Sequence, residues 1–109
     1  MREARLIVPN NGTTHWQGIE DVRALLLAQF GGYTETQGTG GWVGKTGTVT
    51  EPIIIFDVAM EPTEMNEMNM RTVAGFVRHR MNQECVYLRQ ANGQVEFVSP
   101  RSACVAGEG

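Results

Sequence analysis

The chain has 109 residues and a mass of 12.0 kDa, which is the size of one domain rather than two. Hydrophobic residues make up 41% and charged residues 19%, as in a globular protein and unlike a disordered or fibrous one. The formal net charge is -3, from 9 basic and 12 acidic residues, so no overall basic field attracts nucleic acid.

The apolar runs and the cysteines of the chain predict a cytoplasmic protein. Apolar runs such as Ile53–Phe56 are too short to span a membrane, and charges near the amino end interrupt any signal core. The two cysteines, Cys85 and Cys104, have no metal-binding spacing. A disulfide between them stays open, but two reduced thiols are favoured in a chain without a signal peptide.

The first two predicted elements are a strand and a helix. The apolar run Leu6–Val8 predicts a strand, which ends in a turn at Pro9-Asn10-Asn11-Gly12. A helix is predicted over Thr14–Phe30, where Thr14 and Gln17 have capping-box spacing and Gly31-Gly32 ends the helix. Its apolar face repeats at helical spacing through Ile19, Val22, Leu25, Leu26 and Phe30.

A glycine-rich hairpin is predicted next. Tyr33–Gln37 alternates as a second strand, and Pro52–Val58 is the most apolar segment and a third strand, with Pro52 at its first position. Of the 13 glycines, seven fall within Gly31–Gly47. The stretch Gly38–Gly47 is therefore predicted to be a long, irregular and flexible loop.

The second half of the chain repeats the strand and helix pattern. Pro62-Thr63 opens a helix with basic residues in its last turns, and Cys85–Leu88 is a fourth strand. Asn92-Gly93 predicts a hairpin turn into a fifth strand, Val95–Val98, followed by an irregular tail from Ser99. The expected stripe of the second helix consists of Met65, Asn69, Thr72, Val73, Phe76, Val77 and Arg80, with Met68 beside it.

This order of elements predicts an α+β protein, a ferredoxin-like βαββαβ sandwich with an extra C-terminal hairpin strand. One domain would span residues 1–98, with both helices on one face of an antiparallel sheet and an irregular tail over 99–109. Ile53–Phe56 is apolar on both faces, so something must also cover the other face. We expect a homo-oligomer, a dimer or trimer, associated through the sheet; the alternative is that the tail and the glycine-rich loop cover it.

Two phosphate-loop patterns in the glycine-rich stretch fail on register. Gly44-Lys45-Thr46 resembles the end of a P-loop, but Thr39 stands where that motif needs glycine and no helix follows. The dinucleotide pattern needs a glycine where Val43 stands. A plain hairpin loop remains, or a loop whose N–H groups face an anionic ligand. Trp42 must then pack on the core, on a neighbouring subunit or on a ligand.

The acid–base inventory is small. Glu51 precedes the buried third strand, where desolvation raises a carboxyl pKa, and it is the candidate catalytic residue. The candidate ligand-binding residues are Tyr33, Trp42, Lys45 and His15. No metal site and no cofactor are predicted.

The arrangement of motifs resembles a known class of proteins. Leu6-Ile7-Val8, Phe30-Gly31-Gly32-x-Thr34, Gly38-x-Gly40-x-Trp42 and Glu51 before an apolar strand resemble small uncharacterised bacterial and phage proteins of ferredoxin-like fold, over residues 5–98. Thr39-Gly40-x-Trp42 and Gln83-Glu84-Cys85-Val86 are weakly similar to the phage S-adenosylmethionine lyases, which are small ferredoxin-like oligomers with sites between subunits. That family places a catalytic glutamate just after the aromatic residue, where this chain has Val43 and Gly44.

Three functions follow as hypotheses. The first is a small oligomeric binding protein, an accessory (counter-defence) protein of a phage or mobile element that binds a small anionic ligand or a host protein. The second is a small enzyme with sites between subunits, similar to the lyases, that uses Glu51. The third is a structural or assembly subunit. Neither nucleic acid nor a membrane is an expected partner.

Overall fold

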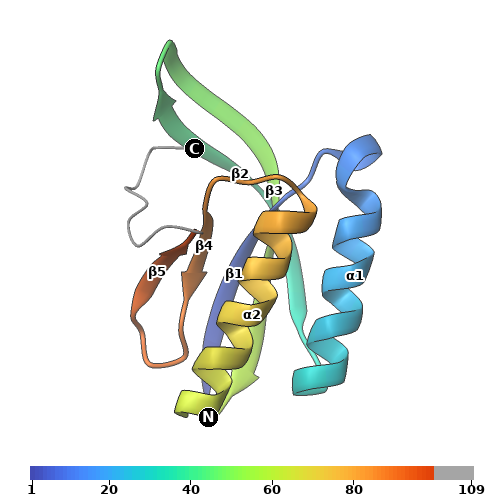
Figure 1. Cartoon of the computed structure of the whole chain (residues 1–109), viewed down its shortest axis with the longest axis vertical. Helices are drawn as coiled ribbons and strands as arrows, with labels where there is room; N and C mark the ends of the chain where they lie inside the picture. The colour runs from blue at the N-terminus through green and yellow to red at the C-terminus, as the bar shows by residue number, and fades with distance from the viewer. Residues whose placement is uncertain (100–109) are drawn as a thin grey trace.

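The computed structural model describes residues 1–99 and confirms the ferredoxin-like fold. Five antiparallel strands lie in the order β2-β3-β1-β4-β5, and two helices connect them (Figure 1). The elements are β1 Arg2–Pro9, α1 Gly12–Phe30, β2 Thr34–Gly44, β3 Gly47–Met60, α2 Glu64–Arg80, β4 Val86–Arg89 and β5 Val95–Val98. The extra strand β5 pairs with β4, as the Asn92-Gly93 turn predicts.

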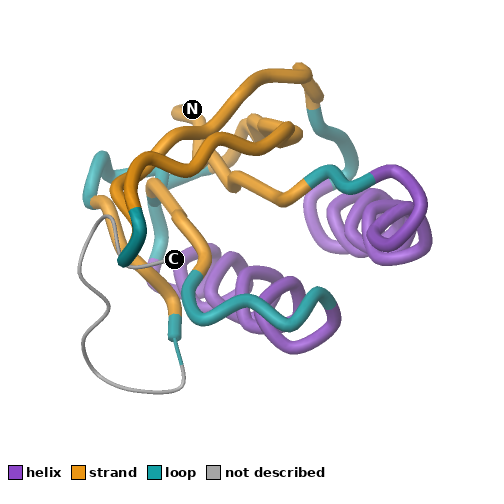
Figure 2. The backbone as a smooth tube through the Cα atoms, turned by 90° about the horizontal axis from the view of Figure 1, so that it is seen from above, coloured by secondary structure: helices purple, strands orange, loops and turns teal. Residues whose placement is uncertain are grey.

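The two helices lie on the same side of the sheet, so the molecule has two layers (Figure 2). The core lies between them because every second residue of the central strands points to the helices. Leu6 of β1, Phe56 of β3 and Leu88 of β4 form one fully buried row across the sheet. From the helices, the core receives Ile19, Val22, Leu26, Met70, Val73, Ala74 and Val77.

The helix starts differ from each other in how they are capped. α1 begins at Gly12, two residues before the predicted start, and its N-cap residue Asn11 makes no side-chain cap bond, so the predicted capping box of Thr14 does not form. α2 begins as predicted, because the Thr63 side chain accepts a hydrogen bond from the N–H of Asn66 at 3.2 Å.

The predicted apolar stripe of α2 was partly wrong. Val73 and Val77 are buried as expected, but Met65 and Met68 are 65% and 59% exposed, whereas Met70 is fully buried. The methionines are spaced so that several faces of this helix carry one, and only contact with the sheet selects the buried face.

The glycine-rich stretch is not the irregular loop that the composition predicted. β2 and β3 pair without interruption from Thr34↔Asp57 to Gly44↔Gly47, and only Lys45-Thr46 form the turn. Gly47 takes φ 129°, a conformation that glycine adopts without steric cost. Because β1 ends at the Pro9↔Ile53 pair, residues 39–52 project beyond the sheet as a two-stranded arm (Figure 1).

Pro52 lies inside β3 and not at its start, which corrects a second prediction. Its carbonyl accepts a hydrogen bond from the N–H of Asn10 at 3.0 Å, so the polar side of this residue faces away from β2. In an antiparallel strand the N–H and C=O of one residue point the same way. The missing N–H of Pro52 therefore costs the β2–β3 ladder no hydrogen bond.

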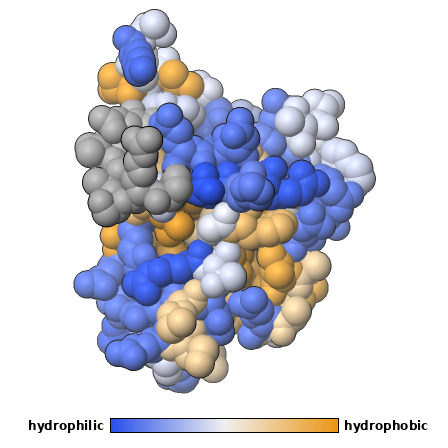
Figure 3. Space-filling model, viewed as in Figure 1, coloured by the Kyte–Doolittle hydropathy of each residue, from blue (hydrophilic) through white to orange (hydrophobic). Residues whose placement is uncertain are grey.

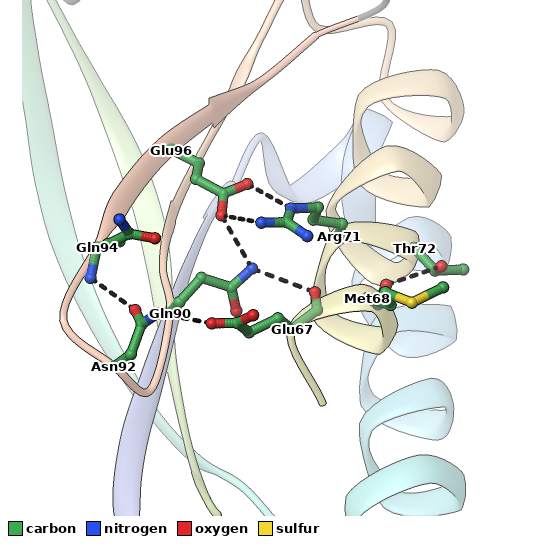
Figure 4. A network of polar contacts seen from close by, with 8 residues as sticks. All are labelled: Glu67, Met68, Arg71, Thr72, Gln90, Asn92, Gln94 and Glu96. Carbon is green, nitrogen blue, oxygen red and sulfur yellow. Dashed lines mark hydrogen bonds and ion pairs between the residues drawn. The ribbon is translucent and has the colours of Figure 1, made fainter. Parts of the chain in front are cut away.

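A buried glutamine fixes the β4–β5 hairpin to α2 (Figure 4). The Gln90 side chain is fully buried, and its Nε2 donates to the Glu67 carbonyl and to Glu96 Oε2, both at 3.2 Å. Glu96 also accepts two hydrogen bonds from Arg71, at 2.7 and 2.8 Å. Gln90 Oε1 accepts no hydrogen bond from any of residues 1–99, but the opposite amide orientation would place this oxygen against two acceptors.

The sheet face opposite the helices carries both apolar and charged residues. Arg5 forms a two-pronged ion pair with Asp57, at 2.8 and 3.0 Å, and Tyr87 packs edge-on against Phe97 at 5.8 Å. Ile53 and Ile55 point to this face, so β3 is apolar on both sides as predicted. Association through this face stays a prediction.

Two sequence predictions concern the end of the chain. Cys85 is disulfide-bonded, which runs against the expectation of reduced thiols, and the second cysteine, Cys104, lies outside the described residues. The predicted irregular tail lies outside them as well, apart from Ser99. No helix of the described residues is both long and apolar enough to cross a membrane.

Candidate functional site

Glu51 is a half-buried carboxyl at the base of the arm. It lies in β3 directly opposite Gly40 of β2, two residues before Ile53. Within residues 1–99 no hydrogen bond or salt bridge holds its carboxylate. Burial raises the pKa of Glu51 above its ordinary value, and attraction to His15 lowers it in part. A partly desolvated acid without a fixed partner is the kind of group that active sites use.

Trp42 lies on the same side of the arm as Glu51. The pairs Gly40↔Glu51 and Trp42↔Val49 are two positions apart in the ladder, and residues two apart point to the same face. Trp42 and Glu51 are thus diagonal neighbours, a separation of about 7–8 Å between Cα atoms. The indole ring and the carboxylate flank Gly40, which has no side chain between them.

Glycines make the floor of this surface. A Cβ atom on Gly40 would lie 3.3 Å from Cγ2 of Ile53, so that side chain already leans over the glycine. A Cβ on Gly38 would touch both Ile53 and Ile55 at ordinary contact distance. The glycines therefore leave room for isoleucine side chains near the sheet and for open surface beside Glu51.

His15 reaches the same region from the first turns of α1. The N–H of Asn11 donates to His15 Nδ1 at 3.1 Å, which places the proton of the neutral ring on Nε2. The hydrogen bond from Asn10 to Pro52 holds this start of α1 against β3. The fold therefore places His15 near enough to Glu51 to affect its pKa, although the sequence indicated the two residues separately.

Tyr33 and Lys45 are not brought to Glu51. Tyr33 packs edge-on against Phe56 in the core, with ring centroids 5.4 Å apart. It lies beside the Thr34↔Asp57 pair, roughly 20 Å along β3 from Glu51 at 3.3 Å per residue. Lys45 stands in the turn at the tip of the arm, roughly 17 Å away by the same rise, because it is five residues from Gly40, the partner of Glu51. Its position between two strands confirms that Gly44-Lys45-Thr46 is no P-loop.

Exposed apolar side chains lie on the arm and beside the start of α1. Val43 and Val49 are 72% and 38% exposed near the tip of the arm, and apolar patches are visible there in Figure 3. Trp16, next to His15, is 58% exposed. Large apolar patches on a small protein often mark contact with a ligand or partner.

Sequence reasoning missed Gly40 and the Asn10 contact as parts of this surface. Gly38, Gly40 and Trp42 stand at alternate positions, which could have indicated one face of a strand. The hydrogen bond from Asn10 to Pro52 has no sequence signal. No group of three or more His, Cys, Asp or Glu side chains in residues 1–99 could hold a metal ion.

Comparisons with known proteins agree on the fold. No family model and no curated protein sequence matches the chain. A phage SAM lyase solved in complex with S-methyl-5'-thioadenosine has a TM-score of 0.70 and 17% identity, over 94% of this chain and 92% of its own. A phage SAM lyase in the apo state gives 0.69 and 17%, over 94% and 91%. The weak likeness predicted from the sequence is thus confirmed in three dimensions, and the chain shares the fold of the phage SAM lyases.

Proposed function

We propose that the protein binds S-adenosylmethionine beside Glu51 and cleaves it, as an accessory protein of a phage or mobile element. The observation that carries this proposal is the half-buried Glu51 carboxyl, which has no hydrogen-bond or ion-pair partner among residues 1–99 and lies next to Trp42 and Gly40. The shared fold supports it, because the similar structures are SAM lyases. The function would suit a counter-defence role, since it removes a methyl donor.

The chemistry of the ligand matches the surface. A sulfonium ion is a fixed positive charge, and a carboxylate in a partly desolvated position attracts it more strongly than one in water. The adenine ring has a flat face that can stack on an indole, which Trp42 offers on the same side of the arm. The bare backbone of Gly40 lets the ligand lie close to the strand.

Cleavage breaks the bond between the sulfonium sulfur and the aminocarboxypropyl carbon. The bonding electron pair goes to sulfur, and neutral S-methyl-5'-thioadenosine leaves. The remaining four-carbon fragment either gives a proton to Glu51 and forms a double bond or closes on its own carboxylate. In the first route Glu51 is the general base that takes this proton, and in the second it binds the sulfonium charge and so positions the ligand.

The test is incubation of the purified protein with S-adenosylmethionine, with both products identified by mass spectrometry. Glu51→Gln should lower the cleavage rate at least about a hundredfold, as removal of a catalytic acid–base group does. Glu3→Gln, an exposed change on β1, is the matched control and should be as active as the parent protein. An unchanged substrate with the parent protein, under conditions where it is folded, would refute the enzymatic proposal.

One observation favours a binding protein without turnover. The carboxylate that follows the aromatic residue in the lyases is replaced by Val43 and Gly44, and Glu51 lies on the neighbouring strand instead. Calorimetric titration separates the two functions, because a binding protein gives a heat of binding with S-adenosylmethionine and releases no product. A titration with small anions such as phosphate tests the anionic ligand, for which Lys45 is the exposed cation of the arm.

A further inference from the structure

One row of side chains crosses all five strands on the sheet face that lies opposite the helices (Figure 2). The neighbouring row through Phe56, Leu6 and Leu88 is buried against the helices, and successive residues of a strand point to opposite faces. The row next to it therefore points away from the helices. From β2 to β5 the ladder pairs join Thr34, Asp57, Arg5, Arg89 and Val95.

Two arginines stand directly opposite each other in this row. Arg5 of β1 pairs with Arg89 of β4, and the Cβ atoms of such partners are about 4.5–5.5 Å apart. Like charges at this separation destabilise a sheet. Asp57 neutralises Arg5, which donates to it at 2.8 and 3.0 Å, but the row has no second carboxylate for Arg89. An excess of positive charge remains at the pair.

The guanidinium of Arg89 is not engaged by any other described side chain. Arg89 is half-buried, and no ion pair or side-chain hydrogen bond reaches it from residues 1–99. Partly buried N–H donors are normally satisfied by a partner. The donors of Arg89 lie on the same face as those N–H groups of Arg5 that Asp57 does not use. Together they are a donor set of the kind that binds anionic oxygen atoms.

An aromatic pair borders the arginines on the same face. Tyr87 and Phe97 are partners in β4 and β5, and their rings meet edge to face with centroids 5.8 Å apart. They stand two positions along their strands from Arg89 and Val95, so all four side chains point to one face. Val95 is 50% exposed, which leaves this corner of the sheet accessible.

We propose that this corner of the sheet binds a nucleotide, with the phosphate group on Arg5 and Arg89 and the base on Tyr87. A guanidinium fork matches phosphate oxygens with two parallel hydrogen bonds. A base has a flat face that stacks on an aromatic ring. The Cα atoms of Tyr87 and Arg89 are about 7 Å apart along the strand, a separation that the ribose of a nucleotide spans between base and phosphate.

The balance of charges favours a phosphate over a carboxylate. The row already holds one carboxylate, Asp57, which is bound by Arg5 alone. A phosphate monoester carries a charge of roughly −1.5 to −2 at pH 7 and has three acceptor oxygens. It can therefore accept from both guanidinium groups at once and offset the positive charge that Asp57 leaves.

This surface is separate from the candidate site at Glu51. Asp57 lies six residues from Glu51 along β3, which is roughly 20 Å. The nucleotide site thus goes beyond the proposed function and does not depend on it.

Calorimetric titration with adenosine 5'-monophosphate at low ionic strength tests the site. The parent protein should bind this nucleotide at least about tenfold more tightly than adenosine or inorganic phosphate, because each of these makes only one of the two contacts. Arg89→Gln should weaken the binding at least about tenfold, since it removes a charge-assisted hydrogen bond. Arg2→Gln, at the exposed start of β1, makes the same charge change and should bind like the parent.

A second variant tests the base contact by itself. Tyr87→Leu keeps an apolar side chain and removes the flat ring, so it should weaken the binding of the nucleotide and leave that of inorganic phosphate unchanged. Benzoate, which joins a ring to a carboxylate, tests the other ligand class that arginine forks accept. Tighter binding of benzoate than of the nucleotide would overturn the choice of phosphate.

Thermal unfolding separates a ligand site from an internal ion pair. Arg89→Gln removes a like-charge pair, so without ligand it should unfold at the same temperature as the parent or at a higher one. The nucleotide should raise the unfolding temperature of the parent and not that of the variant. A variant that unfolds at a lower temperature without ligand would mean that Arg89 has a stabilising partner, and would overturn the proposal.

Three further results would also overturn it. They are no binding of the nucleotide at millimolar concentration, equal binding by Arg89→Gln, and binding that is lost in Trp42→Ala but kept in Arg89→Gln. The last result would place the nucleotide at the candidate site instead. Nucleotide binding can be measured whether or not the protein cleaves S-adenosylmethionine, so a failure of one proposal is distinguishable from a failure of the other.

Discussion

Glu51 lies directly opposite Gly40 in the register of β2 and β3, so the carboxyl faces a strand position without a side chain. Any larger residue opposite would cover the carboxyl, since paired side chains are only about 4.5–5.5 Å apart at Cβ. The projection of the arm beyond β1 leaves the same carboxyl without a neighbour from a third strand. The Glu51 carboxyl is therefore half-buried and open to a ligand. The effect of this burial on its pKa can be tested.

Stability should fall with rising pH because of Glu51. Its folded-state pKa is raised above the ordinary value of 4.5 by burial, so the folded protein binds the proton more tightly than the unfolded chain. The stability that this proton contributes is complete below pH 4.5 and is lost as pH rises through the folded-state pKa. Glu51→Gln should therefore be more stable than the parent protein at pH 7, and the gain should vanish at low pH.

Urea denaturation between pH 4 and pH 8 measures this difference, with Glu3→Gln as the exposed control. A Glu51→Gln variant that loses stability at pH 7 would mean that the carboxylate has a stabilising partner. The same variant should lose ligand binding, because the proposed site uses this carboxylate. A gain in stability with a loss of function is common when a functional group is removed.

The ion pair between Arg71 and Glu96 should show the opposite pH dependence. Hydrogen bonds from Arg71 and Gln90 lower the pKa of Glu96, so its stabilising effect is present above the ordinary pKa and lost as pH falls through the lowered one. A double-mutant cycle with Arg71→Met and Glu96→Gln should give a coupling energy of about 1 kcal/mol at pH 7, because the pair is partly exposed. The coupling should disappear near pH 2; a coupling unchanged by acid would contradict the assignment.

The two helical glycines inside α1 and α2 should respond to substitution with opposite signs. A Cβ on Gly75 would meet nothing within 4 Å, so Gly75→Ala should stabilise the protein by about 0.5–1 kcal/mol through helix propensity. A Cβ on Gly18 would lie 2.6 Å from Cε of the buried Met81, so Gly18→Leu should destabilise by roughly 1–3 kcal/mol through overpacking. Thermal unfolding of both variants checks the contrast, and equal effects would contradict the close approach of α1 to the end of α2.

The second residue after α2, Asn82, should be replaceable by glycine. Asn82 has φ 53°, its N–H donates to the His79 carbonyl, and the N–H of Gln83 donates to the Arg78 carbonyl. These two bonds form a Schellman motif, in which the left-handed residue is usually glycine. Asn82→Gly should be neutral or stabilising by a few tenths of a kcal/mol, and Asn82→Ala should cost about 1 kcal/mol. Urea midpoints measure both; an alanine variant as stable as the glycine variant would contradict the motif.

The sequence predicted those parts of the fold that local chemistry controls. The glycines after Phe30 end α1, Thr63 begins α2, and Asn92-Gly93 turn β4 into β5, because each acts within a few residues of itself. Where several faces of a helix carry similar residues, the spacing of apolar residues does not predict which face is buried. The methionines of α2 show this, since only the sheet decides that Met70 is buried and Met68 is not.

The glycine-rich stretch failed for a related reason. Glycine has a low strand propensity, so its composition predicts a loop. The long β3 strand nevertheless offers a partner for every residue from Thr34 to Gly44, and backbone pairing does not require side chains. The site was predictable only in part. Trp42 shares a face of the arm with Glu51, and His15 is near enough to lower the pKa of Glu51, whereas Tyr33 enters the core and Lys45 stands at the tip of the arm.

By itself, the sequence determined a ferredoxin-like order of elements, because periodicity, caps and turns are encoded locally. Only the tertiary structure decided that Gly38–Gly47 pairs as part of a hairpin whose outer residues form an arm, and that Glu51 faces a glycine beside a tryptophan. It also showed that the outer edge of β2 has no described strand beside it. These properties depend on the register of the β2–β3 hairpin, which is fixed by the position of the Lys45-Thr46 turn. The glycine composition predicted a long loop and therefore did not indicate where that turn lies.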